Sequence, residues 1–268
     1  MIETDAGHFF TKLRGAAQGT STLVAEIIVA VLAEALGLRV PRRVLITFDD
    51  GLVSDDRNDE LADILNASRG CNLGFEFLDG AYDVRLQDLH RISHETASTI
   101  VWLDGLVMNP DRTVRNPNLL VHGDQLWLID HGAALGFHHD WPSVTEDSPR
   151  RPMTLVEPHV LVRLATKLEE IDELLAQKLS RAVIHAAIAE VPDDFLRPLL
   201  PSSALPDAIT RRRTASYSFL WKRLKPPRIF STLARPLESK LDLAPELVAA
   251  APSPFGMAVD EPVAFFRG

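Results

Sequence analysis

Residues 104–141 read DGLVMNPDRTVRNPNLLVHGDQLWLIDHGAALGFHHDW, and this stretch is the most informative about the fold of the chain. Two short apolar runs lie in this stretch, Asn118–His122 and Gln125–Asp130. Gly123-Asp124 separates them, and a Gly/Asp pair between two apolar runs is typical of a tight hairpin turn. The sequence therefore predicts a β-hairpin in the middle of the chain.

Three polar residues flank this predicted hairpin. A helical pattern over His94–Met108 ends at Asn109-Pro110, because a residue before proline rarely stays helical. The loop that follows carries Asp111 and, five positions later, Asn116, and the second strand ends in Asp130. Since a hairpin brings its two ends together, these three side chains are predicted to converge. Phosphoryl-transfer sites keep a base and two metal ligands in this order.

The order Asp111-Arg112, Asn116 and Asp130-His131-Gly132 resembles the HipA-like kinases, a branch of the protein-kinase-like superfamily that is also close to the phosphoinositide kinases. The resemblance extends from about Gly7 to Phe230. It implies an α+β, bilobal, protein-kinase-like fold with a small β-sheet N-lobe and a mainly helical C-lobe. It also implies ATP as phosphate donor, Asp111 as the catalytic base, and Mg²⁺ held by Asn116 and Asp130.

The N-terminal stretch has a predicted strand, His8–Lys12, followed by a predicted helix, Leu23–Leu36. The helix carries Glu26 among apolar neighbours, and a buried carboxylate needs a partner. By resemblance, Lys12 positions the phosphates and Glu26 holds Lys12, so both count as catalytic residues. A solvated lysine at the end of a strand is the alternative for Lys12.

The segment between this strand and helix, RGAAQG (residues 14–19), is a candidate phosphate-binding loop. Gly15 and Gly19 allow backbone N–H groups to face a phosphate, and Arg14 adds positive charge. With Lys12, these three residues are the expected nucleotide contacts. Two glycines four positions apart equally fit a plain strand-to-helix turn. The possible N-cap residues of the helix are Thr20, Ser21 and Thr22.

By resemblance, residues 1–80 form the N-lobe with the nucleotide-binding sheet and helix, and residues 81–230 form the C-lobe with the catalytic loop. Residues Asn72–Leu78 alternate as a strand, which the resemblance places between the lobes beside the adenine. Residues 231–268 are rich in Pro, Ala and Ser with little periodicity, so we expect a loosely structured tail.

Composition narrows the function classes. The 268 residues are 46% hydrophobic, which is ordinary for a globular protein. A formal net charge of −9 argues against binding nucleic acid or an anionic membrane. The single Cys71 excludes an internal disulfide, and with no export signal at the start we expect a cytoplasmic protein. The most apolar stretch, Leu23–Leu38, is too short to span a membrane.

The sequence favours an ATP- and Mg²⁺-dependent kinase whose acceptor is a protein Ser/Thr hydroxyl or a small-molecule hydroxyl. A nucleotide-binding module that acts through a partner protein, a pseudokinase, is the alternative of another class. A transition-metal phosphohydrolase that uses His131, His138 and His139 is a further rival. Adjacent histidines on a strand point in opposite directions, which disfavours shared ligation.

Overall fold

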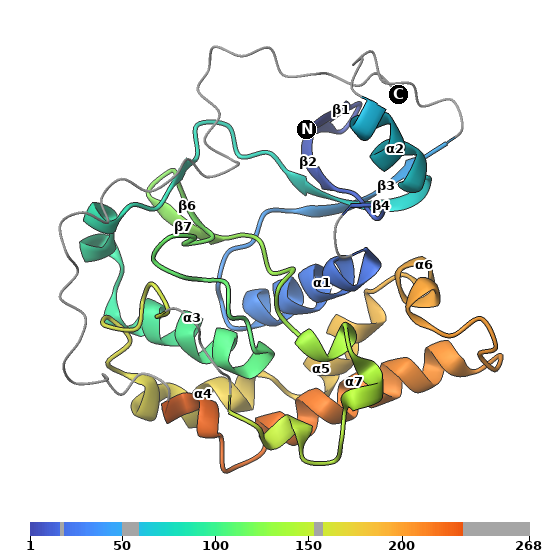
Figure 1. Ribbon diagram of the computed structural model, residues 1–268. Coiled ribbons are helices and arrows are strands. Elements are labelled where there is room, and N and C mark those ends of the chain that lie inside the picture. The colour runs from blue at the N-terminus through green and yellow to red at the C-terminus, as the bar shows by residue number, and fades with distance from the viewer. Residues whose placement is uncertain (17–18, 50–58, 153–157, 233–268) are drawn as a thin grey trace.

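The computed structural model describes residues 1–16, 19–49, 59–152 and 158–232 (Figure 1). Beyond residue 232, the predicted tail lies outside the described residues. The N-terminal part is a four-stranded antiparallel sheet in the order β1-β2-β4-β3. Its strands are β1 (Ile2–Thr4), β2 (Gly7–Lys12), β3 (Arg43–Phe48) and β4 (Gly70–Glu76), and α2 (Asp59–Ala67) precedes β4.

Helix α1 (Thr20–Ala35) lies between the sheet and the helical part of the molecule (Figure 1). It is apolar on nearly all of its faces, and such a helix is buried in the core. Gly37, with φ 87°, follows the C-cap residue Leu36 and terminates the helix. The N-cap prediction was wrong, because Gly19 is the N-cap residue and Thr20, Ser21 and Thr22 lie inside the helix.

The second half of the described chain is mainly helical. Helix α3 (His94–Val107) confirms the helix predicted before Asn109-Pro110, and the left-handed Met108 terminates it. The other helices are α4 (Leu168–Lys178), α5 (Arg181–Ala189), α6 (Asp193–Leu196) and α7 (Ala208–Leu224), with short 3-10 helices at Leu86–Arg91, Arg197–Leu199 and Ile229–Thr232. An antiparallel sheet followed by a helical part confirms the predicted α+β class.

A second, three-stranded sheet consists of β5 (Tyr82–Asp83), β6 (Leu119–His122) and β7 (Gln125–Leu128). Strands β6 and β7 pair in antiparallel register from Leu119 opposite Leu128 to His122 opposite Gln125. Gly123 and Asp124 both have left-handed backbones, with φ 55° and 61°, as a two-residue hairpin turn requires. The predicted hairpin is confirmed, with its second strand ending two residues earlier than expected.

The chain after the hairpin is held against the helices by Arg223 of α7. Its guanidinium donates to the carbonyl of Leu106 in α3 at 2.7 Å and to the carbonyls of Pro149 and Arg151 at 3.0 and 2.9 Å. This loop contains the short 3-10 helices Gly136–His138, Trp141–Ser143 and Ser148–Arg150. Within the described ranges, no helix has the length and apolar character needed to cross a bilayer.

Candidate active site

Lys12, at the end of β2, lies between two carboxylates from other elements. Its Nζ contacts Oε1 of Glu26 in α1 and lies 2.6 Å from Oδ1 of Asp130, just beyond β7. Glu26 is fully buried, whereas the Asp130 side chain is 34% exposed. The structure therefore brings together three of the expected site residues, one each from the sheet, the core helix and the hairpin.

The charges in this cluster do not cancel. Burial raises the pKa of the Glu26 carboxyl even though Lys12 opposes the shift. For Asp130, burial acts in the same direction, but the Lys12 ammonium outweighs it and lowers the pKa. Burial opposes the charged form of Lys12 too, yet the two carboxylates together raise its pKa. Among the described residues Glu26 Oε2 has no hydrogen-bond partner, so two carboxylates share one ammonium, and the donor set favours a further cation.

The backbone at Asp130 is left-handed, with φ 53°. Asn118, which precedes β6, has φ 50°, and its carbonyl accepts a 3.1 Å hydrogen bond from the N–H of Ile129. Asp and Asn tolerate this conformation better than most residues, and strained backbones of this kind gather at functional sites. The hairpin thus brings the segment after β7 beside the loop before β6.

That loop positions Asp111 and Asn116 against each other. Asn116 Nδ2 donates to Asp111 Oδ2 at 2.9 Å, and Asn118 Nδ2 reaches the same oxygen at 3.3 Å. The side chain of Asn109 accepts from the Asp111 N–H at 3.1 Å and so fixes the start of the loop. Because the Asn116 amide nitrogen faces Asp111, its amide oxygen is the atom left to act as a metal ligand.

In the loop after β2, which is the candidate phosphate-binding loop, two backbone N–H groups have partners within the protein. The N–H of Arg14 donates to Asn72 at 2.9 Å and that of Gly15 to Ser68 at 3.1 Å. A Cβ at Gly15 would lie 2.6 Å from the backbone of Ala67, so this glycine permits close packing against α2. Gly19 has φ 67° and is the N-cap residue of α1, and a glycine has no side chain that could cap the helix.

The motif Asp130-His131-Gly132 packs directly on α1. The backbone of His131 opposes the rise in the pKa of Glu26 that burial causes. A Cβ at Gly132 would lie only 2.3 Å from Thr22 Cγ2 and 3.3 Å from Glu26 Oε1. Only a glycine lets the strand end approach the helix this closely, so the contact fixes Asp130 relative to Glu26.

A buried polar network lies behind the loop that carries Asp111 and Asn116. Arg112 Nε donates to Asp104 Oδ2 at 2.6 Å, and His159 Nε2 reaches the same oxygen at 2.9 Å. All three side chains are nearly or fully buried, so Arg112 does not face a phosphate from solvent. His159 was missed from the sequence because it lies 55 positions from Asp104 and belongs to no recognisable motif.

The histidines of the rival metal site have separate surroundings. The ring of His131 contacts Arg112, His139 Nδ1 lies 3.0 Å from Ser21 Oγ, and His138 packs between Phe137 and Trp141. The described part of the chain contains no group of three or more His, Cys, Asp or Glu that could hold a metal ion. The geometry therefore does not favour the hydrolase.

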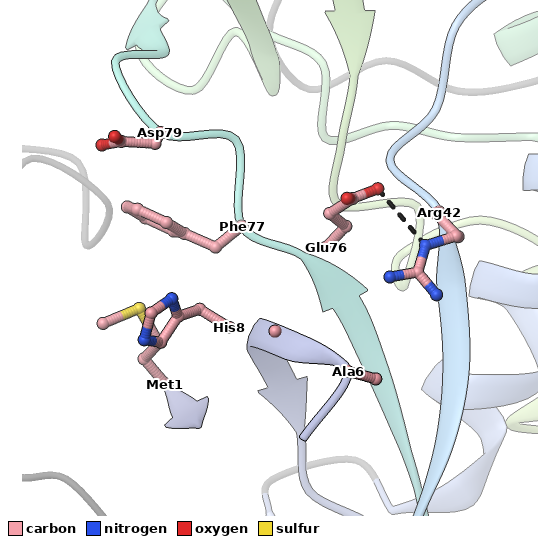
Figure 2. A pocket seen from close by; sticks show the side chains of 8 residues that line it. Met1, Ala6, His8, Arg42, Glu76, Phe77 and Asp79 are labelled. Atoms are coloured by element: carbon pink, nitrogen blue, oxygen red, sulfur yellow. Dashed lines mark ion pairs between the residues drawn. The ribbon is translucent and has the colours of Figure 1, made fainter. Parts of the chain in front are cut away.

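Two cavities open on the described part of the molecule. One of about 340 Å³ lies where β2 and β4 meet, with His8 and Phe77 on one side and the Arg42–Glu76 ion pair on the other (Figure 2). The other, of about 380 Å³, is lined by Pro110 and Ala133 among other residues. Pro110 precedes Asp111 and Ala133 follows Gly132, so this second cavity adjoins both halves of the site.

Comparisons with known proteins point to one family. A family model described as HipA-like kinase matches residues 3–195. Among solved structures, the chain is similar to the crystal structure of a Helicobacter pylori proinflammatory kinase, CtkA, with 13% sequence identity and a TM-score of 0.44, over 81% of this chain and 87% of that chain. No curated protein matches the sequence.

Proposed function

Because the chain belongs to the HipA-like kinase family and is therefore a phosphotransferase, we propose that it transfers the γ-phosphate of ATP, with Mg²⁺, to a hydroxyl group of a protein or a small molecule. The observation that carries this proposal is the position of Lys12 between Glu26 and Asp130. A lysine held by a helix glutamate, beside a metal-binding aspartate, is the arrangement that a kinase needs around the donor phosphates.

The metal ligands in this proposal are Asp130 and Asn116. A carboxylate and an amide oxygen are hard donors, which suit Mg²⁺. Bound Mg²⁺ would neutralise the charge on the phosphate oxygens during transfer. Lys12 would contact the same phosphates, and Glu26, fixed by its burial in α1, would keep the ammonium in place.

The nucleotide would lie along the Lys12 face of the sheet. Phe10 stands two residues before Lys12 on that face, and its partner across the sheet is Phe75 in β4. These rings offer an apolar surface for the base that continues toward Phe77 and the cavity at the end of β4. The N-terminal end of α1 lies after Lys12 in the chain, and the helix dipole favours negative charge there, which supports phosphates at that end of the helix.

The acceptor would reach Asp111 from the cavity lined by Pro110 and Ala133. The two amide donors, Asn116 and Asn118, both bond Asp111 Oδ2, so Oδ1 is the atom that would accept the hydroxyl proton. The side chains around this cavity include apolar Phe137 and Phe219 together with charged Asp140 and Arg151. Such a mixed surface supports an acceptor that presents its hydroxyl next to an apolar group.

Two measurements test the proposal. Purified protein should convert ATP in the presence of Mg²⁺, whereas a pseudokinase would bind ATP without turnover. Phosphoproteomics and metabolite profiling of cells that express the wild type or Asp111→Ala should then identify the acceptor. A cytoplasmic location belongs to the proposal, since ATP is abundant there and the single Cys71 is buried and free. Absence of any Mg²⁺-dependent turnover would refute it.

A further inference from the structure

The carboxylate of Asp104, at the end of α3, is completely buried and accepts four hydrogen bonds. Asn109 Nδ2 and Arg112 Nη2 bond Oδ1 at 3.0 and 3.4 Å. Arg112 Nε and His159 Nε2 bond Oδ2 at 2.6 and 2.9 Å. A carboxylate has about four lone-pair sites, so all of them are used. With burial opposing the charged form, Arg112 and then His159 lower the pKa of Asp104 below its usual range, and the group stays ionised.

The hydrogen bonds of His159 define its tautomer. Its Nδ1 accepts a 3.0 Å bond from the backbone N–H of Leu161, so the proton of the neutral ring is on Nε2. Nε2 therefore donates to Asp104. Both ring nitrogens therefore form hydrogen bonds. The rigid ring accepts one bond from Leu161 and donates the other to Asp104.

Arg112 passes this fixation on to both halves of the site. Its Nη1 donates to the carbonyl of Asn118, which stands at the start of the hairpin, and its Nη2 lies 3.3 Å from Nδ1 of His131. His131 directly follows Asp130 in the chain, and Asp130 is one of the two carboxylates beside Lys12. The contacts therefore run from His159 through Asp104 and Arg112 to the residues that hold Lys12.

The backbone repeats this connection. Thr113 and His159 form an isolated antiparallel bridge, and the N–H of Val160 donates to the carbonyl of Arg112 at 3.0 Å. We propose that His159 is a positioning residue, which through Asp104 and Arg112 fixes the catalytic loop relative to Asp130. The expected effect on the rate rests on the proposed function, whereas the expected effect on the position of the loop rests on the geometry alone.

Removing the His159 donor would shift Arg112, which contacts both Asn118 and His131. A buried carboxylate that loses one donor must be compensated by its remaining donors, and Arg112, which already bonds both oxygens, would shift toward it and away from Asn118 and His131. A shift of about 1 Å at a reacting group lowers the rate roughly 100-fold. The rate should therefore fall although His159 touches neither donor nor acceptor.

The test compares three variants of the full chain. His159→Phe keeps the ring but removes both hydrogen bonds, and His159→Gln retains an N–H donor for Asp104. Leu175→Ala in α4 removes buried volume outside the network and serves as a control for lost stability. We expect His159→Phe to lower kcat roughly 100-fold with little change in KM for ATP, His159→Gln to restore most of the rate, and Leu175→Ala to retain it.

Hydrogen exchange of the nucleotide-free protein gives a readout that needs no activity. In His159→Phe, peptides that contain residues 109–118 and 160–161 should exchange roughly tenfold faster, while those from α5 and α7 stay unchanged. Uniformly faster exchange, or a kcat no lower than that of Leu175→Ala, would overturn the positioning role. If the wild type transfers no phosphate, the proposed function fails, and the exchange pattern still decides whether His159 fixes the loop.

Discussion

Lys12 Nζ lies 2.6 Å from Asp130 Oδ1, so a cation of the protein itself neutralises the carboxylate that we propose as a metal ligand. A metal ion that enters without nucleotide must compete with this ammonium. Nucleotide phosphates would offer Lys12 another anionic partner and release Asp130. We therefore expect metal and nucleotide to bind together, with weak Mg²⁺ binding when nucleotide is absent.

Replacing Lys12 with methionine should separate metal binding from catalysis. Without the ammonium, two carboxylates would face each other, so we expect Lys12→Met to bind Mn²⁺ or Mg²⁺ at least about tenfold more tightly in the absence of nucleotide, while phosphoryl transfer is lost. Calorimetry on metal-free protein measures the affinity. Lys167→Met, at a lysine that is 44% exposed, is the control. Unchanged or weaker metal binding in Lys12→Met would argue against Asp130 as a metal ligand.

Asp111→Ala should abolish transfer and retain nucleotide affinity, since the proposed base touches the acceptor and not the donor. The loss in kcat should be about 100-fold or more, as for other general bases. Binding of a fluorescent ATP analogue measures the affinity in parallel with turnover. Asp124→Ala removes a carboxylate that is 83% exposed in the hairpin turn and should affect neither. Equal loss of binding and turnover would identify Asp111 as a structural loop residue.

Gly132→Ala should destabilise the fold, because the new Cβ would lie 2.3 Å from Thr22 Cγ2. Overpacking of this kind reduces the free energy of unfolding by about 1–3 kcal/mol. Adding Thr22→Ser removes the clashing methyl group, so the double variant should recover part of the loss. Gly136→Ala, where a Cβ would meet nothing within 4 Å, is the matched control. Urea denaturation of the four proteins measures the differences, and equal stability of all four would disprove the close contact.

His138 should make the stability of the fold depend on pH. Burial, and after it the nearby Arg212 and His139, lowers the pKa of His138 from 6.5 to about 3. A histidine whose pKa is lower in the folded state contributes stability above its unfolded pKa and loses it as the pH falls toward its folded pKa. As the pH falls from 6.5 toward 3, protonation of this group should lower the free energy of unfolding by about 1.4 kcal/mol per pH unit.

Removal of this histidine gives the corresponding experiment. His138→Phe should lack that part of the pH dependence, and it should be at least as stable as the wild type at pH 7, because neither ring nitrogen of His138 has a partner among the described residues. Urea denaturation at several pH values between 7 and 4 measures this. His185→Phe, at an exposed position of α5, should keep the wild-type slope. The same slope in His138→Phe would contradict the prediction.

The sequence was sufficient for features that follow from local chemistry. Neighbouring residues determine the turn at Gly123-Asp124 and the end of α3 before Asn109-Pro110. A single physical requirement, that a buried carboxylate needs a partner, predicted the contact of Glu26. The N-cap of α1 was predicted incorrectly, because Thr20, Ser21 and Thr22 are good capping residues, yet the left-handed Gly19 sets where the helix begins. The capping propensity of these three residues was therefore less important than the left-handed turn at Gly19, which sets the start of the helix.

The network around Asp104 could not be predicted from the sequence. Its carboxylate accepts four hydrogen bonds, which come from Asn109 and Arg112 of the following loop and from His159, 55 positions away. No spacing rule joins such residues, since the fold alone brings His159 against the loop that carries Asp111 and Asn116. The roles of Asp111, Asn116 and Arg14 remain predictions, and Asp111→Ala tests the first of them.

The burial of α1 limits how this kinase can be controlled. Six large apolar side chains of the helix are almost completely inaccessible to solvent: Leu23, Val24, Ile27, Ile28, Val29 and Leu32. Exposing them would cost on the order of 10 kcal/mol at about 1.5–3 kcal/mol for each side chain. An outward-swung helix would thus be populated in fewer than about one molecule in a million. Glu26 is therefore held beside Lys12 by the core of the molecule and does not act as a movable switch.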